Sequence, residues 1–207
     1  MPEDIFRYFP LLSEQQKERL SRLKEIYENW NSKINVISRK DMDNFLIHHV
    51  LHSLAIAKVI TFLPSTRILD AGTGGGFPGI PLSILFPDSE FTLLDSVGKK
   101  VKVVSSVINE LGLKNVHAKW ERAEDEKSKY DFVVCRAVSE FMPFVKMVAK
   151  NIDKGGNNNL RNGIIYLKGG DLKEELKFYK NKAIVWDIRN FFDEPFFETK
   201  KIVYLSV

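Results

Sequence analysis

The sequence predicts an α/β protein: a mostly parallel sheet with helices on both faces, preceded by an N-terminal helical extension and ended by an antiparallel hairpin. Two observations predict this. Strand-like and helical runs alternate from Arg67 onward, and the last two strand-like runs are separated by a short turn. The 207 residues suffice for one well-packed core and are few for two independent domains. We expect residues 1–64 to form the extension and residues 65–207 the core of one structural domain.

The extension is expected to hold two long helices. Apolar residues recur at helical spacing from Ser13 to Trp30, and Ser13 followed by Gln16 fits a capping box. A second periodic run predicts a helix from Phe45 to Phe62, which Pro64 would close.

From residue 67 the pattern becomes that of a βαβ protein. The strand-like runs are, in order, RILDA, EFTLLD, NVHAKW, YDFVVC and GIIYLK. The helical runs that follow them are PGIPLSILF, KKVKVVSSVINELG, FMPFVKMVAK and DLKEELKFYK. The runs AIVWDIRNFF and FFETKKIVYLSV predict the hairpin, and the polar run GGNNNLRNG is expected to be an exposed loop.

A glycine-rich segment follows the first predicted strand. It places five glycines between Gly72 and Gly79 and contains one GxGxxG pattern, which is a weak signal alone. A dinucleotide would put its phosphates on the following helix, where the carboxylate of Asp70 would repel them. That carboxylate suits the cationic S-adenosylmethionine, and Asp95 lies about 20 residues further on, where a ribose-binding acid is expected. The loop favours S-adenosylmethionine, with a dinucleotide or a plain strand-to-helix turn as alternatives.

The residues after the fourth predicted strand bear on the reaction. The order Cys135, Arg136, Ala137 replaces the (Asp/Asn)-Pro-Pro-aromatic motif typical of exocyclic amine methylation. Cys135 could be the nucleophile of a pyrimidine C5 methyltransferase, although we favour a small buried strand residue. Arg136 and Lys168 both follow strands at the ligand-binding edge. Two cations beside a cationic cofactor indicate an anionic partner such as a nucleic-acid backbone.

Composition limits the remaining classes of function. The net charge of +4 and a pI of about 9.0 permit RNA as a partner without requiring it. A single cysteine allows no intrachain disulfide and fits a reducing compartment. No run approaches the roughly 18 apolar residues of a membrane span. We therefore expect a cytoplasmic protein with no membrane partner. His48 and His52 stand one helical turn apart, but no metal is expected there.

Seven segments spread over nearly the whole chain together resemble one family. They are Lys33–Arg39, His49–Leu54, Asp70–Leu82, Leu94–Lys100, Arg122–Glu124, Cys135–Ala137 and Leu167–Gly169. The combination resembles the GidB (glucose-inhibited division protein B) family of bacterial rRNA guanine-N7 methyltransferases. The resemblance implies a class I S-adenosylmethionine-dependent methyltransferase (Rossmann-like) fold. It also implies methylation of guanosine 527 in the 530 loop of 16S rRNA, met as naked RNA, as an assembly intermediate or in the small ribosomal subunit.

The resemblance also implies the site residues. Those expected to bind the cofactor are Asp70, Gly72, Thr73, Gly74, Phe77, Pro78, Asp95, Ala123, Glu124 and Arg136. Those expected to meet the RNA or the methyl-transfer point are Asn35, His49, Arg122, Arg136 and Lys168. The family usually has an acid where His52 stands and often Arg where His48 stands. A monomer is expected. Because N7 of guanine already carries an in-plane lone pair, catalysis would be mostly positioning.

Overall fold

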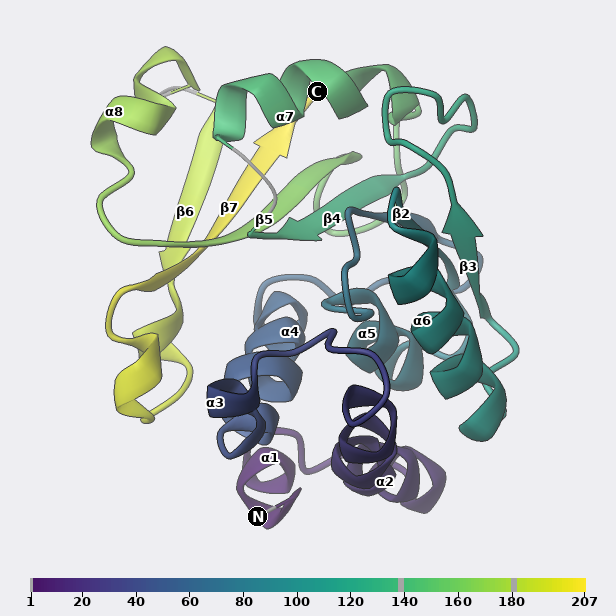
Figure 1. Ribbon diagram of the computed structural model, residues 1–207. Coiled ribbons are helices and arrows are strands. Elements are labelled where there is room, and N and C mark those ends of the chain that lie inside the picture. The colour runs from purple at the N-terminus through teal and green to yellow at the C-terminus, as the bar shows by residue number, and fades with distance from the viewer. Residues whose placement is uncertain (1, 138–139, 180–181) are drawn as a thin grey trace.

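The architecture is a seven-stranded sheet between two layers of helices (Figure 1). It is seen in a computed structural model that describes residues 2–137, 140–179 and 182–207. The strands are β1 (Arg67–Ala71), β2 (Glu90–Asp95), β3 (Val116–Trp120), β4 (Phe132–Arg136), β5 (Gly163–Gly169), β6 (Ala183–Asp187) and β7 (Lys200–Ser206). The longer helices are α1 (Pro2–Tyr8), α2 (Glu14–Asn31), α5 (Gly79–Leu85), α6 (Gly98–Glu110) and α7 (Phe141–Val148).

The strand order is β3-β2-β1-β4-β5-β7-β6. The first five strands are parallel, whereas β7 runs antiparallel to both β5 and β6. The predicted α/β class and the predicted terminal hairpin are therefore confirmed. The hairpin enters the sheet by its second strand, because β7 lies between β5 and β6. The carboxyl ends of β1, β2, β3 and β4 meet at one edge, where open α/β sheets bind ligands.

The extension differs from its prediction in one helix. The capping box of Ser13 and Gln16 forms at the start of α2, as expected. The helix predicted from Phe45 to Phe62 is confirmed over residues 45–58, but it ends early and its hydrogen-bond pattern changes along its length. Its successive segments are the π-helical η1 (Leu46–Leu51), α4 (His52–Leu54) and the 3₁₀ turn η2 (Ala55–Lys58). Beyond them the chain is non-helical, and Phe62 packs on the rings of Phe86 and Phe132. Apolar spacing alone could not separate this core-facing segment from a helix.

Each face of the sheet covers its own apolar cluster. On one face, residues of the extension such as Leu20 and Val50 pack with Ile68 and Phe132 of the strands and with α5 and α6. On the other face, α7 and α8 (Lys173–Leu176) cover a second cluster. Figure 1 shows this division, with the N-terminal helices below the sheet and α7 above it. The extension thus shares a core with the sheet, and its position relative to the strand ends is fixed by burial.

The connection between β6 and β7 also contacts the N-terminal extension. Glu194 accepts hydrogen bonds from Arg7 and Tyr8, and the ring of Phe196 stacks on His48 with centroids 3.9 Å apart. The polar loop of residues 155–163 also contacts the extension, because the Asn158 side chain accepts from the backbone N–H of Leu63. Among the described residues, no helix combines the length and the hydropathy that a bilayer crossing demands.

Candidate active site

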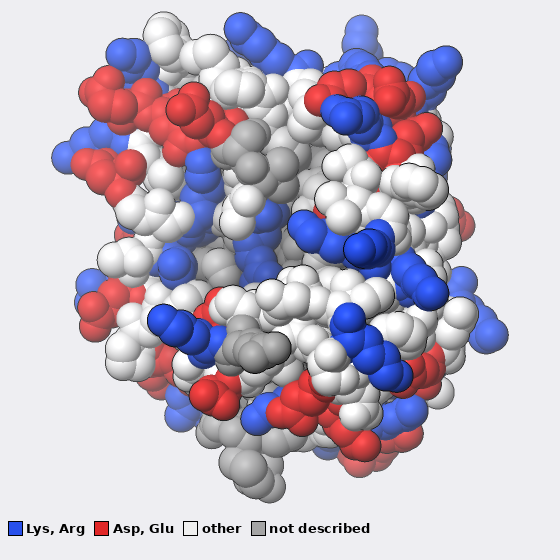
Figure 2. Space-filling model, in the orientation of Figure 1, with Lys and Arg blue, Asp and Glu red and all other residues white. Residues whose placement is uncertain are grey.

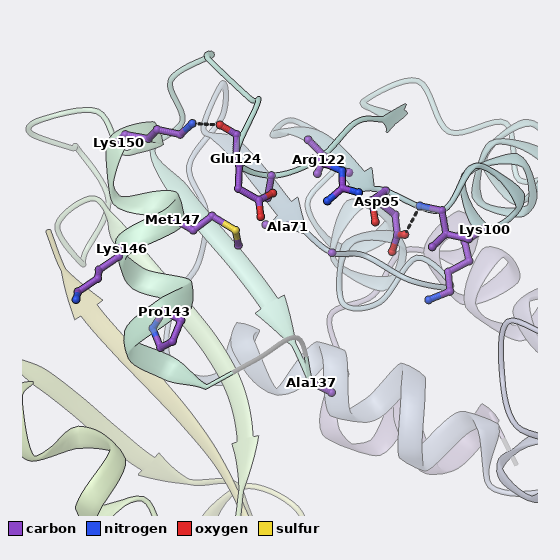
Figure 3. A pocket seen from close by; sticks show the side chains of 15 residues that line it. Ala71, Asp95, Lys100, Arg122, Glu124, Ala137, Pro143, Lys146, Met147 and Lys150 are labelled. Atoms are coloured by element: carbon purple, nitrogen blue, oxygen red, sulfur yellow. Dashed lines mark hydrogen bonds between the residues drawn. The ribbon is translucent and has the colours of Figure 1, made fainter.

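A cavity of about 850 Å³ opens at the carboxyl ends of β1, β2, β3 and β4 (Figure 3). Its lining residues are Ala71, Gly72, Leu94, Asp95, Ser96, Val97, Lys100, Arg122, Ala123, Glu124, Ala137, Pro143, Lys146, Met147 and Lys150. The volume is in the range of sites for small molecules of cofactor size.

Asp70 organises the glycine loop from below. Its buried Oδ2 accepts hydrogen bonds from the Thr73 hydroxyl at 2.6 Å and from the backbone N–H of Gly79 at 2.8 Å. A Cβ on Gly79 would lie 2.8 Å from that oxygen, so only glycine fits there. Gly74 has φ +59° and Gly76 has φ +97°, which other residues rarely adopt. The carboxylate thus occupies the first amide of α5, which a dinucleotide phosphate would need.

Asp95 holds the same loop from the cavity side. Its Oδ2 accepts from the backbone N–H of Gly74 and its Oδ1 from that of Val97, each at 2.8 Å. Both oxygens retain lone pairs for the hydroxyls of a ligand. The carboxylate lines the cavity and so stands where a nucleoside ribose could reach it.

The residues present fit S-adenosylmethionine. Burial raises the pKa of Asp70 to about 7, and its Oδ1 is buried with no hydrogen-bond partner among the described residues. A positive charge over the loop would stabilise the ionised carboxylate, whereas a phosphate would oppose it. Val97, Ala123 and Met147 supply apolar wall for a base, and Asp95 supplies acceptors for a ribose.

The predicted cofactor residues divide into two groups. Gly72, Asp95, Ala123 and Glu124 line the cavity. The others do not line it. Asp70, Thr73, Gly74, Phe77 and Pro78 build the loop behind it, and Arg136 faces the extension. No sequence signal marks Pro143 and Met147, because their apolar helix has the pattern of an ordinary core helix. Val97 and Lys100 lie in the segment Leu94–Lys100, whose resemblance to the family could have identified them.

Arg136 is bonded to the N-terminal extension. Its Nη1 donates to the carbonyl of His48 and its Nη2 to Nδ1 of His49, each at 2.8 Å, and its guanidinium lies 5.2 Å from the Phe77 ring centroid. Because arginine only donates, Nδ1 of His49 must accept. Burial, with the nearby Arg136, lowers the pKa of His49 to about 3, and burial lowers the pKa of Arg136 to about 10. His49 is therefore neutral and cannot accept a substrate proton through Nδ1.

Lys168 and Asn35 occupy different surroundings. The Lys168 ammonium pairs with Glu175 of α8, so its charge already has a partner in this chain. The prediction that Lys168 needs an external anion to balance its charge is therefore corrected by Glu175. Asn35 is exposed. It directly precedes Val36, whose side chain lies against Gly75 of the glycine loop. The side chain of Arg39 lies outside the described part of the structure.

Cys135 and the two remaining histidines have structural surroundings. Cys135 is fully buried, and burial raises the pKa of its thiol. His48 Nδ1 lies 2.9 Å from Oδ1 of Asp41, a neighbour that the sequence spacing did not predict. His52 is buried against the ring of Phe197, and burial lowers its pKa. In the described ranges no group of three His, Cys, Asp or Glu side chains is arranged to hold a metal ion.

Comparison with known proteins places the chain among methyltransferases. A family described as rRNA small subunit methyltransferase G, GidB, matches residues 16–200. The chain is 56% identical to a ribosomal RNA small subunit methyltransferase G of Phocaeicola vulgatus, over 99% of this chain and 98% of that one. It is 54% identical to the protein of that name from Cytophaga hutchinsonii, over 97% of each.

Solved structures agree on the fold. The chain resembles an S-adenosylmethionine-dependent methyltransferase from Aquifex aeolicus with a TM-score of 0.58 and 16% identity, over 78% of this chain and 92% of that one. A precorrin-6y C5,15-methyltransferase from Geobacter metallireducens gives a TM-score of 0.55 at 12% identity, over 75% and 87%. At these identities the likeness shows the fold alone, and that fold is the class I methyltransferase fold predicted from the sequence.

Proposed function

This chain belongs to the GidB family of small-subunit rRNA methyltransferases, and we propose that it methylates N7 of a guanine in the 530 loop of 16S rRNA. It is an S-adenosylmethionine-dependent enzyme, as its family membership and its fold establish. The choice of N7 depends on two side chains near the end of β4, Cys135 and His49. A methylated pyrimidine carbon needs a nucleophile and a protonated nitrogen needs a base, whereas guanine N7 needs neither.

The main observation is that Cys135 cannot act as a nucleophile and His49 cannot act as a base. A pyrimidine C5 mechanism needs a reactive thiolate, and Cys135 is buried with a raised pKa. Methylation of a protonated nitrogen benefits from a base, and His49 is neutral, with Nδ1 occupied by Arg136. Guanine N7 needs neither, because its lone pair is free.

Positioning is therefore the main task of the protein. The cofactor supplies an electrophilic methyl group on sulfur, and N7 would attack it in line, giving S-adenosylhomocysteine with no proton released. Asp95 would hold the ribose, and Asp70 would hold the loop in shape while its charge favours the cation. Arg136 has five N–H donors, of which two are in the contacts described, so it could still donate to guanine O6. Lys168 would contact an RNA phosphate by exchanging its ion pair with Glu175 for the phosphate.

The charge on the surface supports an RNA substrate. Figure 2 shows Lys and Arg side chains in a band across the middle of one face, with Asp and Glu mostly above and below it. Among the described residues, the cations that line the cavity and form no ion pair are Lys100, Arg122, Lys146 and Lys150, of which Lys150 donates to the backbone carbonyl of Glu124. Cations without carboxylate partners beside a cationic cofactor favour an anionic substrate.

Mass mapping of the methylated nucleotide tests the proposal. Small subunits and naked 16S rRNA from a strain lacking this protein would be incubated with the enzyme and S-adenosylmethionine. We expect one added methyl group in the 530 loop, on a guanine that becomes sensitive to the strand cleavage specific for N7-methylguanine. A methyl group on a pyrimidine, or at an exocyclic amine, would contradict it.

Calorimetry tests the dinucleotide alternative. It should show binding of S-adenosylhomocysteine and none of NAD, and tight NAD binding would revive that alternative.

A further inference from the structure

Trp120, at the carboxyl end of edge strand β3, is held in place but left open to solvent. Its side chain is 73% exposed. Its Nε1 donates to the carbonyl of Ser96 at 3.0 Å, and its ring lies 3.1 Å from the position that a Cβ on Gly98 would take. An exposed tryptophan usually costs solubility and gains nothing from packing. Trp120 is held by the Nε1 hydrogen bond to Ser96 and by the contact of its ring with Gly98, and the rest of its aromatic surface is open to another molecule.

The position of Trp120 places it on the rim of the cofactor cavity. In the sheet register it pairs directly with Asp95, and its hydrogen-bond acceptor, Ser96, lines the cavity. A molecule resting on the indole would therefore lie at the mouth of the cofactor cavity, beside Asp95. The cofactor itself is accounted for by the cavity, whose lining does not include Trp120.

Two cations of the cavity lining belong to the two segments that hold this ring. Lys100 lies two residues beyond Gly98 on α6, and Arg122 lies two residues beyond Trp120. Figure 3 shows both side chains on the side of the cavity where Asp95 lies. In the described part of the chain, neither forms an ion pair. The neighbouring Glu121 pairs with Lys119, a lysine that it shares with Glu126.

We propose that Trp120 is a stacking platform for an unpaired base of the RNA substrate, with Lys100 and Arg122 contacting the adjoining phosphates. An open aromatic face on the rim of a cavity whose cations Lys100 and Arg122 form no ion pair among the described residues suits a single-stranded nucleic acid, because bases stack on the ring while phosphates meet the positive charges. The proposal rests on the proposed rRNA substrate and adds a second contact to it, beyond the reacting guanine.

Fluorescence tests the platform without any substitution of Trp120. The chain has three tryptophans, so the double variant Trp30→Phe/Trp186→Phe leaves Trp120 as its only indole. We expect a short unstructured oligoribonucleotide to quench its emission strongly and saturably. Emission that stays unchanged while the oligonucleotide binds, as followed by anisotropy of a label on the RNA, would overturn the proposal.

Steady-state kinetics with small subunits provides the second test. We expect Trp120→Ala to raise the KM for RNA at least about fivefold, the low end of what one base–aromatic stack contributes, and Trp120→Phe to stay close to wild type. The dissociation constant of S-adenosylhomocysteine should be unchanged in both variants. Phe178→Ala removes a similarly exposed ring, 69% accessible, far along the chain, and should have no effect. An unchanged KM in Trp120→Ala, a loss of cofactor affinity instead, or an equal loss in Phe178→Ala would each overturn the proposal.

Salt dependence separates stacking from phosphate contacts. Each of Lys100→Ala and Arg122→Ala should lower the slope of log affinity against log salt by about 0.7, whereas Trp120→Ala should lower affinity and leave the slope unchanged. A reduced slope in Trp120→Ala would contradict stacking. If the wild-type enzyme methylates no 16S rRNA, the proposed function fails. If it does so and Trp120→Ala matches it, only the platform fails.

Discussion

The two halves of the carboxyl edge of the sheet hold their polar residues in different ways. At the ends of β1 and β2, Asp70 and Asp95 bond the backbone of loops that are at most 21 residues away in the chain. At the end of β4, Arg136 reaches across 88 residues to His48, whereas Lys168 of β5 pairs with Glu175 only seven residues away. The cofactor half is built from nearby segments, and the substrate half depends at Arg136 on packing between distant segments.

Because of this difference, we expect the cofactor half to be rigid and the substrate half to change its contacts when RNA binds. The acids of the cofactor half bond backbone amides that cannot move without unfolding the loop, so that half is preorganised. The cations of the substrate half bond side chains and a carbonyl on separate elements, and these contacts can exchange for contacts to an arriving RNA. The substitutions below are expected to affect cofactor binding in the first half and methyl transfer in the second.

Asp95 should produce the largest loss in the cofactor half. Asp95→Ala removes the acceptor of the Gly74 and Val97 amides as well as the proposed ribose contact. Hydrogen bonds to a charged group contribute on the order of 1.5–3 kcal/mol, so cofactor affinity should fall by roughly 10- to 100-fold. Isothermal titration with S-adenosylhomocysteine measures it. An unaltered dissociation constant in a folded variant would refute the assignment.

Arg136 should show the opposite pattern. Arg136→Ala should lower the single-turnover rate of methyl transfer at least about tenfold, while S-adenosylmethionine affinity stays nearly unchanged, because the guanidinium bonds the extension rather than the cavity wall. Arg136→Lys should not restore the rate, since an ammonium cannot replace the planar fork that spans His48 and His49. Loss of cofactor binding with normal RNA binding would break the division between the two halves.

The same division explains what the sequence could and could not predict. The strands, α2, the terminal hairpin and the braced glycine loop follow from local periodicity and from motif spacing. The partners of Arg136 did not follow, because they come from η1, 87 and 88 residues away, and no local pattern encodes that packing. Glu175 lies only seven residues from Lys168, in a run predicted to be helical, but spacing alone did not pair their charges. The helix predicted over residues 45–62 ends at Lys58, because the chain beyond it is non-helical and packs Phe62 on the rings of Phe86 and Phe132. Apolar spacing does not distinguish such a buried segment from a helical face.

Asp70 predicts a moderate pH effect. Its pKa is about 7 when folded, against 3.8 for an ordinary aspartate. Between these values the folded chain binds the extra proton, so the free energy of unfolding should fall as pH rises from about 4 to about 7. Cofactor binding should change in the other direction, because a cation favours the ionised form. We expect affinity at about pH 6 to be up to about tenfold below that at pH 8. Asp70→Asn, followed by calorimetry and thermal unfolding, should lose both dependences; their persistence would assign them to another group.

Cys135 should matter least, although it stands next to Arg136. Its side chain is fully buried on β4, and burial keeps the thiol protonated. Cys135→Ala removes the sulfur without adding a polar group, so methyl transfer should stay within about twofold of wild type. Cys135→Ser buries a hydroxyl instead and should lower the free energy of unfolding by about 1–3 kcal/mol if that hydroxyl finds no partner. Activity should nevertheless remain substantial. Complete loss of methyl transfer in both variants, with the fold intact by circular dichroism, would restore the covalent pyrimidine mechanism and overturn the N7 assignment.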